Sequence, residues 1–185
     1  IKYAQLYFYD VTHGKFSISI DNAYKHVAEF ADAGNIPCAF YAYALGSIIA
    51  QTNVNLEIYD CSHLDRVISY MNILDRTDHP ISEKDKADVW YNYGLSLMNQ
   101  NKNAESMNWF KLAIPYNANA EMLYAYLLSE QASTQGAHSP LLADVYKHAK
   151  HAVERNDCEK KKEFEMVTCG VLAKMTRNGL GAPID

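Results

Sequence analysis

The stretch YKHVAEFADAGN at residues 24–35 returns in outline as YKHAKHAVERND at residues 146–157. A third copy around Trp109-Phe110 and a weaker one at Val67 to Leu74 lie between them, so the copies start near residues 24, 67, 106 and 146, about 40 residues apart. A fixed period of this size is typical of helical solenoids, because one helical hairpin cannot bury its apolar face alone. The sequence therefore predicts an all-α fold, a right-handed α-α superhelix of about four and a half helical hairpins.

Helix start and stop signals divide the chain into inner and outer helices. Asp21 is the expected N-cap of one outer helix and Gly34 ends it, while Ser82 and Asp85 have capping-box spacing. Ser139 and Pro140 start another outer helix. The expected inner helices span 3–12, 38–51, 83–99 and 120–133, the outer ones 21–33, 62–76, 103–114 and 141–155, and a last helix 158–177. We expect one repeat domain over 1–178 and a tail over 179–185.

Composition narrows the classes of partner. The 185 residues are 49% hydrophobic and carry a formal charge of −5, whereas phosphate binding needs clustered Lys and Arg. No apolar stretch reaches the roughly 20 residues of a membrane span. We therefore expect no nucleic acid partner and no membrane span. The chain begins at Ile1 rather than Met, so we expect a fragment or a processed product, which leaves the compartment open.

The four cysteines, Cys38, Cys61, Cys158 and Cys169, have no metal-ligand spacing and no C-x-x-C. Cys158 and Cys169 fall on one expected helix about 16 Å apart, beyond the reach of a disulfide. We expect four free and mostly buried thiols.

The run from Trp90 to Leu97 supplies the specific packing signal. Trp90, Tyr93, Gly94 and Leu97 have the inner-helix spacing W-x2-L-G-x2-Y of tetratricopeptides, and Ser106, Phe110 and Ala113 continue with the outer-helix pattern. A small residue lets two helices approach closely while large residues fill the surrounding groove. The same pivot is expected at Gly46 and Gly170, and Leu127-Leu128 departs from it.

The longer period and the residues of 14–46 resemble the Sel-one-like repeat family. Gly14, Asp21, Phe30-Ala31, Gly34-Asn35 and Leu45-Gly46 fall on its pattern. The resemblance implies a helical-repeat adaptor that holds another protein, and many bacterial members work in or beyond the cell envelope. Some are immunity proteins against secreted toxins, which suits an acidic chain and a basic partner. The resemblance slightly favours the periplasm, although the cytoplasm stays open.

The predicted partner surface is the concave face of the inner helices. Residues about six and three before each pivot, and about one, four and five after it, share the helix side turned toward the groove. The pivots used are Gly46, Gly94 and the corresponding position of the fourth copy. They are Phe40, Tyr43, Ser47, Gln51, Asp88, Tyr91, Leu95, Asn99, Met122 and Ser129. The alternative is that many of these residues pack against the next hairpin. If the groove binds a protein, Tyr43 and Tyr91 are the expected aromatic anchors.

Signals for chemistry are weak. Asp144, His148 and His151 share one helix face, and Asp60, Cys61 and His63 lie close together, yet neither group has the partners that a metal site or a nucleophile needs. No phosphate loop or hydrolase motif occurs. We predict no catalytic residue, no metal, no cofactor and no enzyme activity. The alternative is an envelope enzyme or small-ligand binder, for peptidoglycan or β-lactam-like ligands, of the cysteine-rich branch of the Sel-one-like family, although the regular cysteine spacing is missing.

Overall fold

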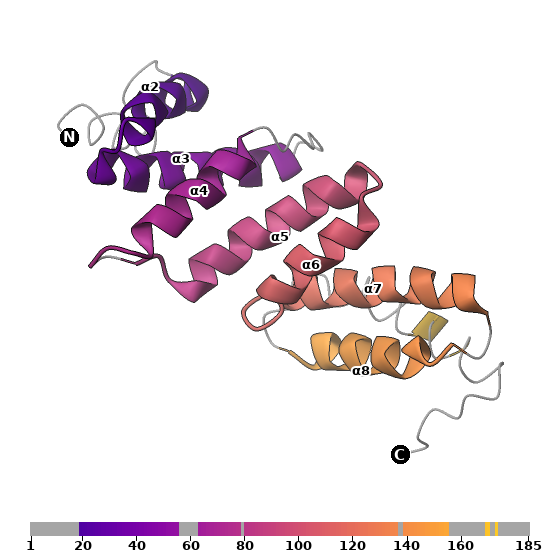
Figure 1. The fold of residues 1–185 in the computed structure, drawn as a ribbon. Coiled ribbons are helices and arrows are strands. Elements are labelled where there is room, and N and C mark those ends of the chain that lie inside the picture. Colours follow the sequence, from indigo (N-terminus) through magenta and orange to yellow (C-terminus); the bar gives the residue numbers. More distant parts are fainter. Residues whose placement is uncertain are drawn as a thin grey trace. The chain divides into compact units, whose positions relative to one another are not determined.

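The structure is a computed structural model, and it describes residues 19–55, 63–78, 80–136, 139–155, 169–170 and 173. Within these residues the chain forms seven named α-helices and no strand, so the all-α prediction is confirmed (Figure 1). They are α2 (Ile20–Asp32), α3 (Ile36–Asn55), α4 (Leu64–Leu74), α5 (Glu83–Asn99), α6 (Asn103–Ala113), α7 (Ala118–Gln135) and α8 (Leu141–Glu154). The expected helix at 3–12, most of that at 158–177 and the tail at 179–185 lie outside the described residues.

Local capping signals set several helix starts as expected. The Ser82 hydroxyl accepts from the Asp85 amide at 3.2 Å and donates to the Asp85 carboxylate at 2.6 Å, which confirms the capping box of α5. Gly34 follows α2 with φ of 90°, a left-handed conformation that favours glycine. Asn117 begins α7 by accepting from the Ala120 amide at 3.0 Å.

Two helix starts differ from the predictions. The N-cap of α2 is Ser19 rather than Asp21, because the extended backbone of Ser19 lets its hydroxyl accept from the Asn22 amide. Asp21 lies instead in the first turn, where its negative charge favours the helix dipole. Helix α3 begins at Ile36 rather than Cys38, because Asn35 accepts from the Cys38 amide at 3.0 Å and so caps an earlier start.

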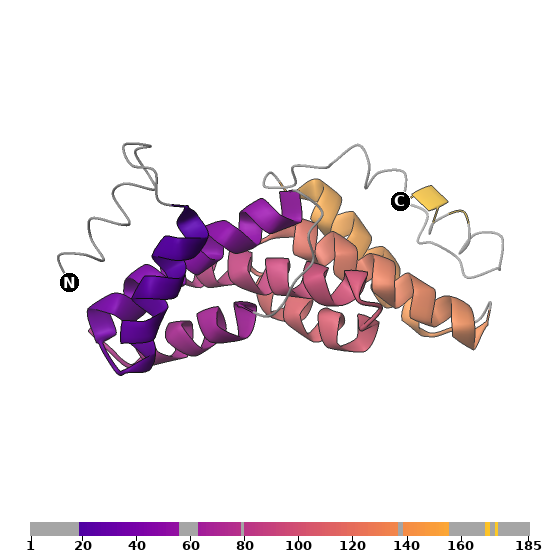
Figure 2. The same cartoon turned by 90° about the horizontal axis from the view of Figure 1, so that it is seen from above.

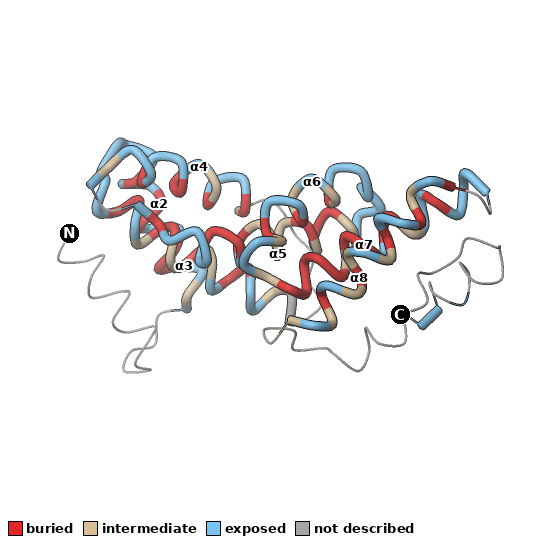
Figure 3. The backbone as a smooth tube through the Cα atoms, turned by 90° about the horizontal axis from the view of Figure 1, so that it is seen from below, coloured by how far each residue is buried: buried red, intermediate tan, exposed pale blue. Residues whose placement is uncertain are grey.

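The chain divides into two compact units, residues 1–101 and 102–185, and each is described by itself. In unit 1, α3 contacts α2, α4 and α5, so it is the central helix of this unit (Figure 2). Its buried apolar core includes Tyr24, Leu45 and Val67, with Trp90 of α5 packed against it. Figure 3 shows buried and exposed segments alternating along each helix, as expected for helices with one apolar face.

The predicted pivot at Gly46 is confirmed by its surroundings. A Cβ at Gly46 would come within 2.3 Å of Val67 Cγ2 on α4 and 3.1 Å of Tyr24 on α2. Both neighbours are buried core residues. Only a residue without a side chain therefore lets α3 approach both helices.

Unit 2 is arranged around α7, which contacts α6 and α8. Its α7–α8 core consists mostly of small residues, which allow the two helices to lie close together. The predicted hairpin of α5 and α6, with Gly94 as its pivot, joins helices of different units and stays a prediction, as does the right-handed superhelix.

The expectation of mostly buried thiols is only partly met. Cys38 and Cys169 are free, but Cys169 is exposed, and Cys61 and Cys158 lie outside the described residues. Gly170 is also exposed, and a Cβ there would contact nothing within 4 Å. The pivot predicted at Gly170 is therefore wrong, because no described neighbour approaches it.

Candidate functional site

A groove of about 260 Å³ lies between α3 and α5 in unit 1. We call it the α3–α5 groove. Its lining residues are Tyr43, Ser47 and Gln51 from α3 and Asp85, Asp88, Val89 and Asn92 from α5. The α3 residues are spaced by four, and the α5 residues fall at i, i+3, i+4 and i+7. Each set therefore lies on one face of its helix.

Four of the residues predicted for the partner surface line this groove. They are Tyr43, Ser47, Gln51 and Asp88. They come from α3 and α5, which the sequence predicts to be successive inner helices, and the register on Gly46 and Gly94 predicts that they share a common face. Four of the ten predicted positions thus line one groove of unit 1, and their role in partner binding stays a prediction.

The other predicted residues are placed differently. Phe40 and Asn99 are exposed, and Tyr91 and Leu95 are half-buried. Met122 has no exposed surface and packs in the α7–α8 core, so it cannot be a surface residue. Its position in the fourth copy was assigned without a glycine pivot, and the packing of α8 on α7 decided its burial. Ser129 is half-buried on α7, and its hydroxyl donates to the Tyr126 carbonyl at 2.7 Å.

Tyr43 is both a core residue and a lining residue. Its side chain belongs to the core of unit 1, and the residue is 7% exposed. Burial, together with the smaller effect of the nearby carboxylates of Asp85, Asp88 and Asp75, raises the pKa of Tyr43 to about 12, against a hydrogen bond with Ser47 that lowers it. The phenol therefore stays neutral near pH 7, and Tyr43 contributes an uncharged side chain to the lining of the groove.

Asn92 is the buried polar lining residue that sequence reasoning missed. It is 3% exposed, and its side-chain Oδ1 has no hydrogen-bond partner. Buried polar atoms are nearly always paired, so an orphan acceptor beside a groove needs an explanation. The sequence did hold a signal for this residue. Val89, Asn92 and Ser96 are spaced at i, i+3 and i+7, so Asn92 lies on the same buried face of α5 as the other two.

Lys86, which lies between Asp85 and Asp88 in the sequence, is already engaged in ion pairs. Lys86 Nζ lies 2.7 Å from Asp75 and 2.7 Å from Glu83, and its side chain is 9% exposed. Burial works to lower the pKa of Lys86, but the hydrogen bonds to Asp75 and Glu83 outweigh it and raise the pKa. The Lys86 charge is thus held by two carboxylates that do not line the groove.

A second hollow of about 340 Å³ lies among α2, α3 and α4. Its lining residues are Asp21, Tyr24, Lys25, Ile49, Asn53, His63 and Arg66. It carries charges of both signs, and the Tyr24 hydroxyl is buried in it without a hydrogen-bond partner. Burial raises the pKa of Tyr24. Asp60 and Cys61, which the sequence places near His63, lie outside the described residues.

In unit 2 the buried carboxylate of Glu121, on α7, contacts two histidine side chains of α8. Glu121 lies 3.0 Å from His148 Nδ1 and 2.7 Å from His151 Nδ1, with Arg155 Nη1 at 3.5 Å. Asp144, which shares a helix face with the two histidines, is exposed. The histidines therefore face Glu121, a residue that the sequence pattern did not single out. We call this set the α7–α8 seam. Among the described residues no group of three or more His, Cys, Asp or Glu could hold a metal ion.

Within the described part of the chain no helix has both the length and the apolar character to cross a membrane. A scan against protein-family models found no match. Searches of curated proteins and of solved structures likewise returned no match. The resemblance to Sel-one-like and tetratricopeptide repeats therefore stays a prediction from the sequence.

Proposed function

We propose that this chain is a non-enzymatic protein-binding module, and that a segment of a partner protein lies in the α3–α5 groove. The observation that carries the proposal is the convergence of predicted contact positions in one groove: Tyr43, Ser47 and Gln51 from α3 with Asp88 from α5. The repeat register assigns all four residues to that face independently of how α3 and α5 pack. Concave faces of helical repeats are the surfaces such proteins use for partners.

The size and chemistry of the groove favour a partner side chain over a small molecule. Its volume of about 260 Å³ is below the roughly 300–1,000 Å³ typical of small-molecule sites. The second hollow, about 340 Å³, falls within that range, and it is where a small-ligand binder would hold its ligand. The α3–α5 groove instead offers polar groups on two sides, as the edge of a protein interface does.

The charge of the groove sets the kind of partner. Asp85 and Asp88 line it, and the whole chain carries a formal charge of −5. A basic segment would be steered toward this face, and its association rate would fall as added salt screens the attraction. The partner is therefore a protein with a positively charged contact surface.

Photo-crosslinking in the source organism tests the proposal. A benzophenone amino acid replaces exposed Gln51 at the groove or, as a matched control, exposed Glu29 on α2, which does not line it. We expect a protein that crosslinks from position 51 and not from position 29. That protein is then purified, and its Kd is measured by calorimetry against the parent and against Asp88→Asn.

The proposal predicts weaker binding by Asp88→Asn and a slower association rate at higher salt. Equal crosslinking from both positions, or a purified partner whose Kd does not change with Asp88→Asn, would place binding elsewhere on the chain. If substitutions in the second hollow, rather than Asp88→Asn, abolished the crosslink, the contact surface would be that hollow and not the α3–α5 groove.

A further inference from the structure

We infer that the α3–α5 groove is a socket for an arginine side chain of the partner protein, held by the acidic residues of α5 and by Asn92. The inference rests on the proposed function and names the chemistry that the groove recognises. It is carried by three observations: the row of acceptors on α5, the unpartnered oxygen of Asn92, and the negative field at Tyr43.

The acceptors on α5 form a single row. Asp85, Asp88 and Asn92 lie at i, i+3 and i+7, so they share one helix face over about 10 Å. One oxygen of Asp85 already accepts from the Ser82 hydroxyl at 2.6 Å, but a carboxylate has about four acceptor sites. The described residues that line the groove include no Lys, Arg or His. The described lining of the groove thus contributes two carboxylates and no cationic side chain.

Asn92 adds a buried acceptor without a partner to the two carboxylates of α5. Asn92 lines the groove, and its buried Oδ1 has no hydrogen-bond partner, while the residue is only 3% exposed. Leaving a buried acceptor unpaired costs stability, and an N–H donor entering the groove removes that cost. An occupant that satisfies Asn92 must therefore bring at least one N–H donor.

The electrostatic field inside the groove has the matching sign. The carboxylates of Asp85, Asp88 and Asp75 all raise the pKa of Tyr43, in addition to the larger effect of its burial. A field that disfavours a phenolate favours a cation at the same place. A positively charged donor is therefore attracted, and an anionic ligand is repelled.

Arginine fits these requirements better than lysine. Its guanidinium presents five N–H donors in a planar fork, so one group can reach a carboxylate and the Asn92 oxygen together. It is also more weakly hydrated than an ammonium ion, which lowers the cost of entering a half-buried groove. The aliphatic stem of the arginine can lie along Val89 at the groove wall.

An NMR titration of the full ¹⁵N-labelled chain tests the socket with small probes. The probes are the N-acetyl N-methylamides of arginine, lysine and citrulline, and citrulline keeps the shape of arginine without its charge. We expect arginine to shift the Asn92 side-chain amide and backbone amides around Asp88 and Ser47. Citrulline should bind about tenfold more weakly, because hydrogen bonds from a charged donor are stronger than neutral ones.

Three variants sharpen the test. Asp88→Asn removes one acceptor charge from an exposed position, and Asn92→Leu removes the unpartnered oxygen with little change in shape. Each should weaken arginine binding about three- to tenfold. Glu29→Gln removes the same charge from α2, away from the groove, and should leave binding unchanged. Circular dichroism verifies that each variant is folded, and Asp88→Asn keeps the test valid if Asn92→Leu does not fold.

The outcomes separate this inference from the proposed function. Citrulline or lysine binding as tightly as arginine, or shifts that map outside the groove, would overturn the arginine socket. If the crosslinked partner still required Asp88 in that case, the protein-binding proposal would stand without it. If arginine bound the groove but the partner crosslinked equally from both positions, the proposed function would fail instead.

Discussion

The α3–α5 groove of unit 1 and the α7–α8 seam of unit 2 each contain a buried polar side chain, on α5 and on α7 respectively. Asn92 is 3% exposed and Glu121 is 2% exposed. Glu121 has His148, His151 and Arg155 within 3.5 Å. Asn92 Oδ1, by contrast, has no partner. The two side chains are therefore about equally buried, but the Glu121 carboxylate has polar partners and the Asn92 oxygen has none.

Under the function proposed above, the difference separates polar groups that hold the fold from a polar group that is kept for a ligand. A buried carboxylate that has all its partners joins two helices and leaves nothing for a third molecule to bind. A buried amide oxygen without a partner weakens the fold slightly, and such local costs concentrate at functional sites. Changing the first kind of residue is expected to reduce stability, whereas changing the second kind is expected to reduce recognition.

Breaking the seam should have the strongest effect on stability. Glu121→Ala should lower the stability of unit 2 by about 3–5 kcal/mol, because it leaves the positive charge of Arg155 and two polar histidines without their buried counterpart. Hydrogen exchange of the α7 and α8 amides measures this locally. The control Asp144→Ala changes an exposed residue on α8 and should shift stability by less than about 0.5 kcal/mol. Similar exchange rates in both variants would mean that the seam does not support the fold.

A middle effect is expected where α3 closely approaches α4, at Gly46. Gly46→Ala adds a Cβ that would meet Val67 Cγ2 at 2.3 Å, so it should cost about 1–3 kcal/mol by overpacking. Thermal unfolding measures the loss. Val67→Ala removes the opposing methyl groups, so the double variant should lose less than the sum of the two single variants. Simple additivity would mean that these two residues do not limit the approach of α3 to α4.

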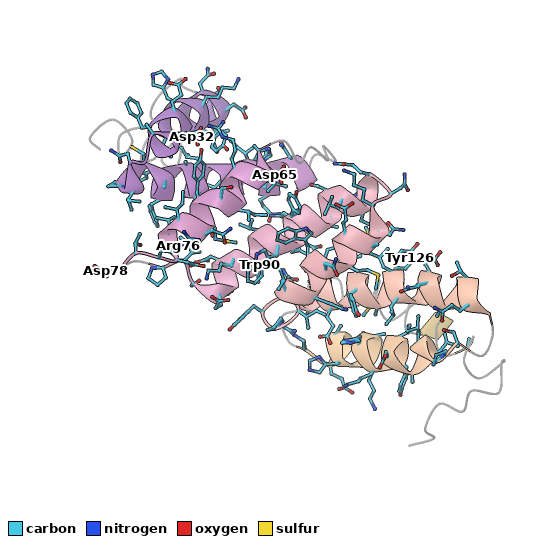
Figure 4. The ribbon with its side chains drawn as sticks, viewed as in Figure 1. Asp32, Asp65, Arg76, Asp78, Trp90 and Tyr126 are labelled. Carbon is cyan, nitrogen blue, oxygen red and sulfur yellow. The ribbon has the colours of Figure 1, made fainter. Side chains whose placement is uncertain are left out.

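A weaker effect is expected at a polar cluster that is satisfied but exposed. Asp32 on α2 accepts from the Tyr70 hydroxyl at 2.6 Å and pairs with Arg66 of α4; Asp32 is labelled in Figure 4. The Tyr70 hydrogen bond and Arg66 lower the pKa of Asp32 below its ordinary 3.8. This contribution to stability is therefore complete above pH 3.8 and is lost as the pH falls through the folded-state pKa.

Asp32→Asn should remove the part of the fall in unfolding free energy below pH 3.8 that comes from protonation of Asp32. Because half of the Asp32 side chain is exposed, the loss at neutral pH should stay under about 1 kcal/mol. Urea unfolding between pH 2 and pH 7 measures both quantities. A larger loss than that of Glu121→Ala would contradict the idea that burial decides how much a satisfied polar group contributes.

Helix positions could be predicted closely from the sequence because their signals are local. The capping box at Ser82 and Asp85 and the glycine at Gly34 act within one turn, and the structure contains both. The wrong N-cap at Asp21 is a local error of the same kind, since Ser19 competes two residues away. Four lining residues of the groove were also within reach, because helix periodicity alone decides which side chains share a face.

Local signals in the chain specify which segments are helices, which faces they offer and where a small residue must lie between them, as at Gly46. The packing of the helices decides that Met122 is buried, that Glu121 meets two histidines of α8, and that Asn92 has an oxygen without a partner. The two kinds of property differ in range. Capping and periodicity depend on neighbours within a few residues, whereas burial and hydrogen-bond satisfaction depend on side chains about 30 or more positions away that only the packed helices bring together.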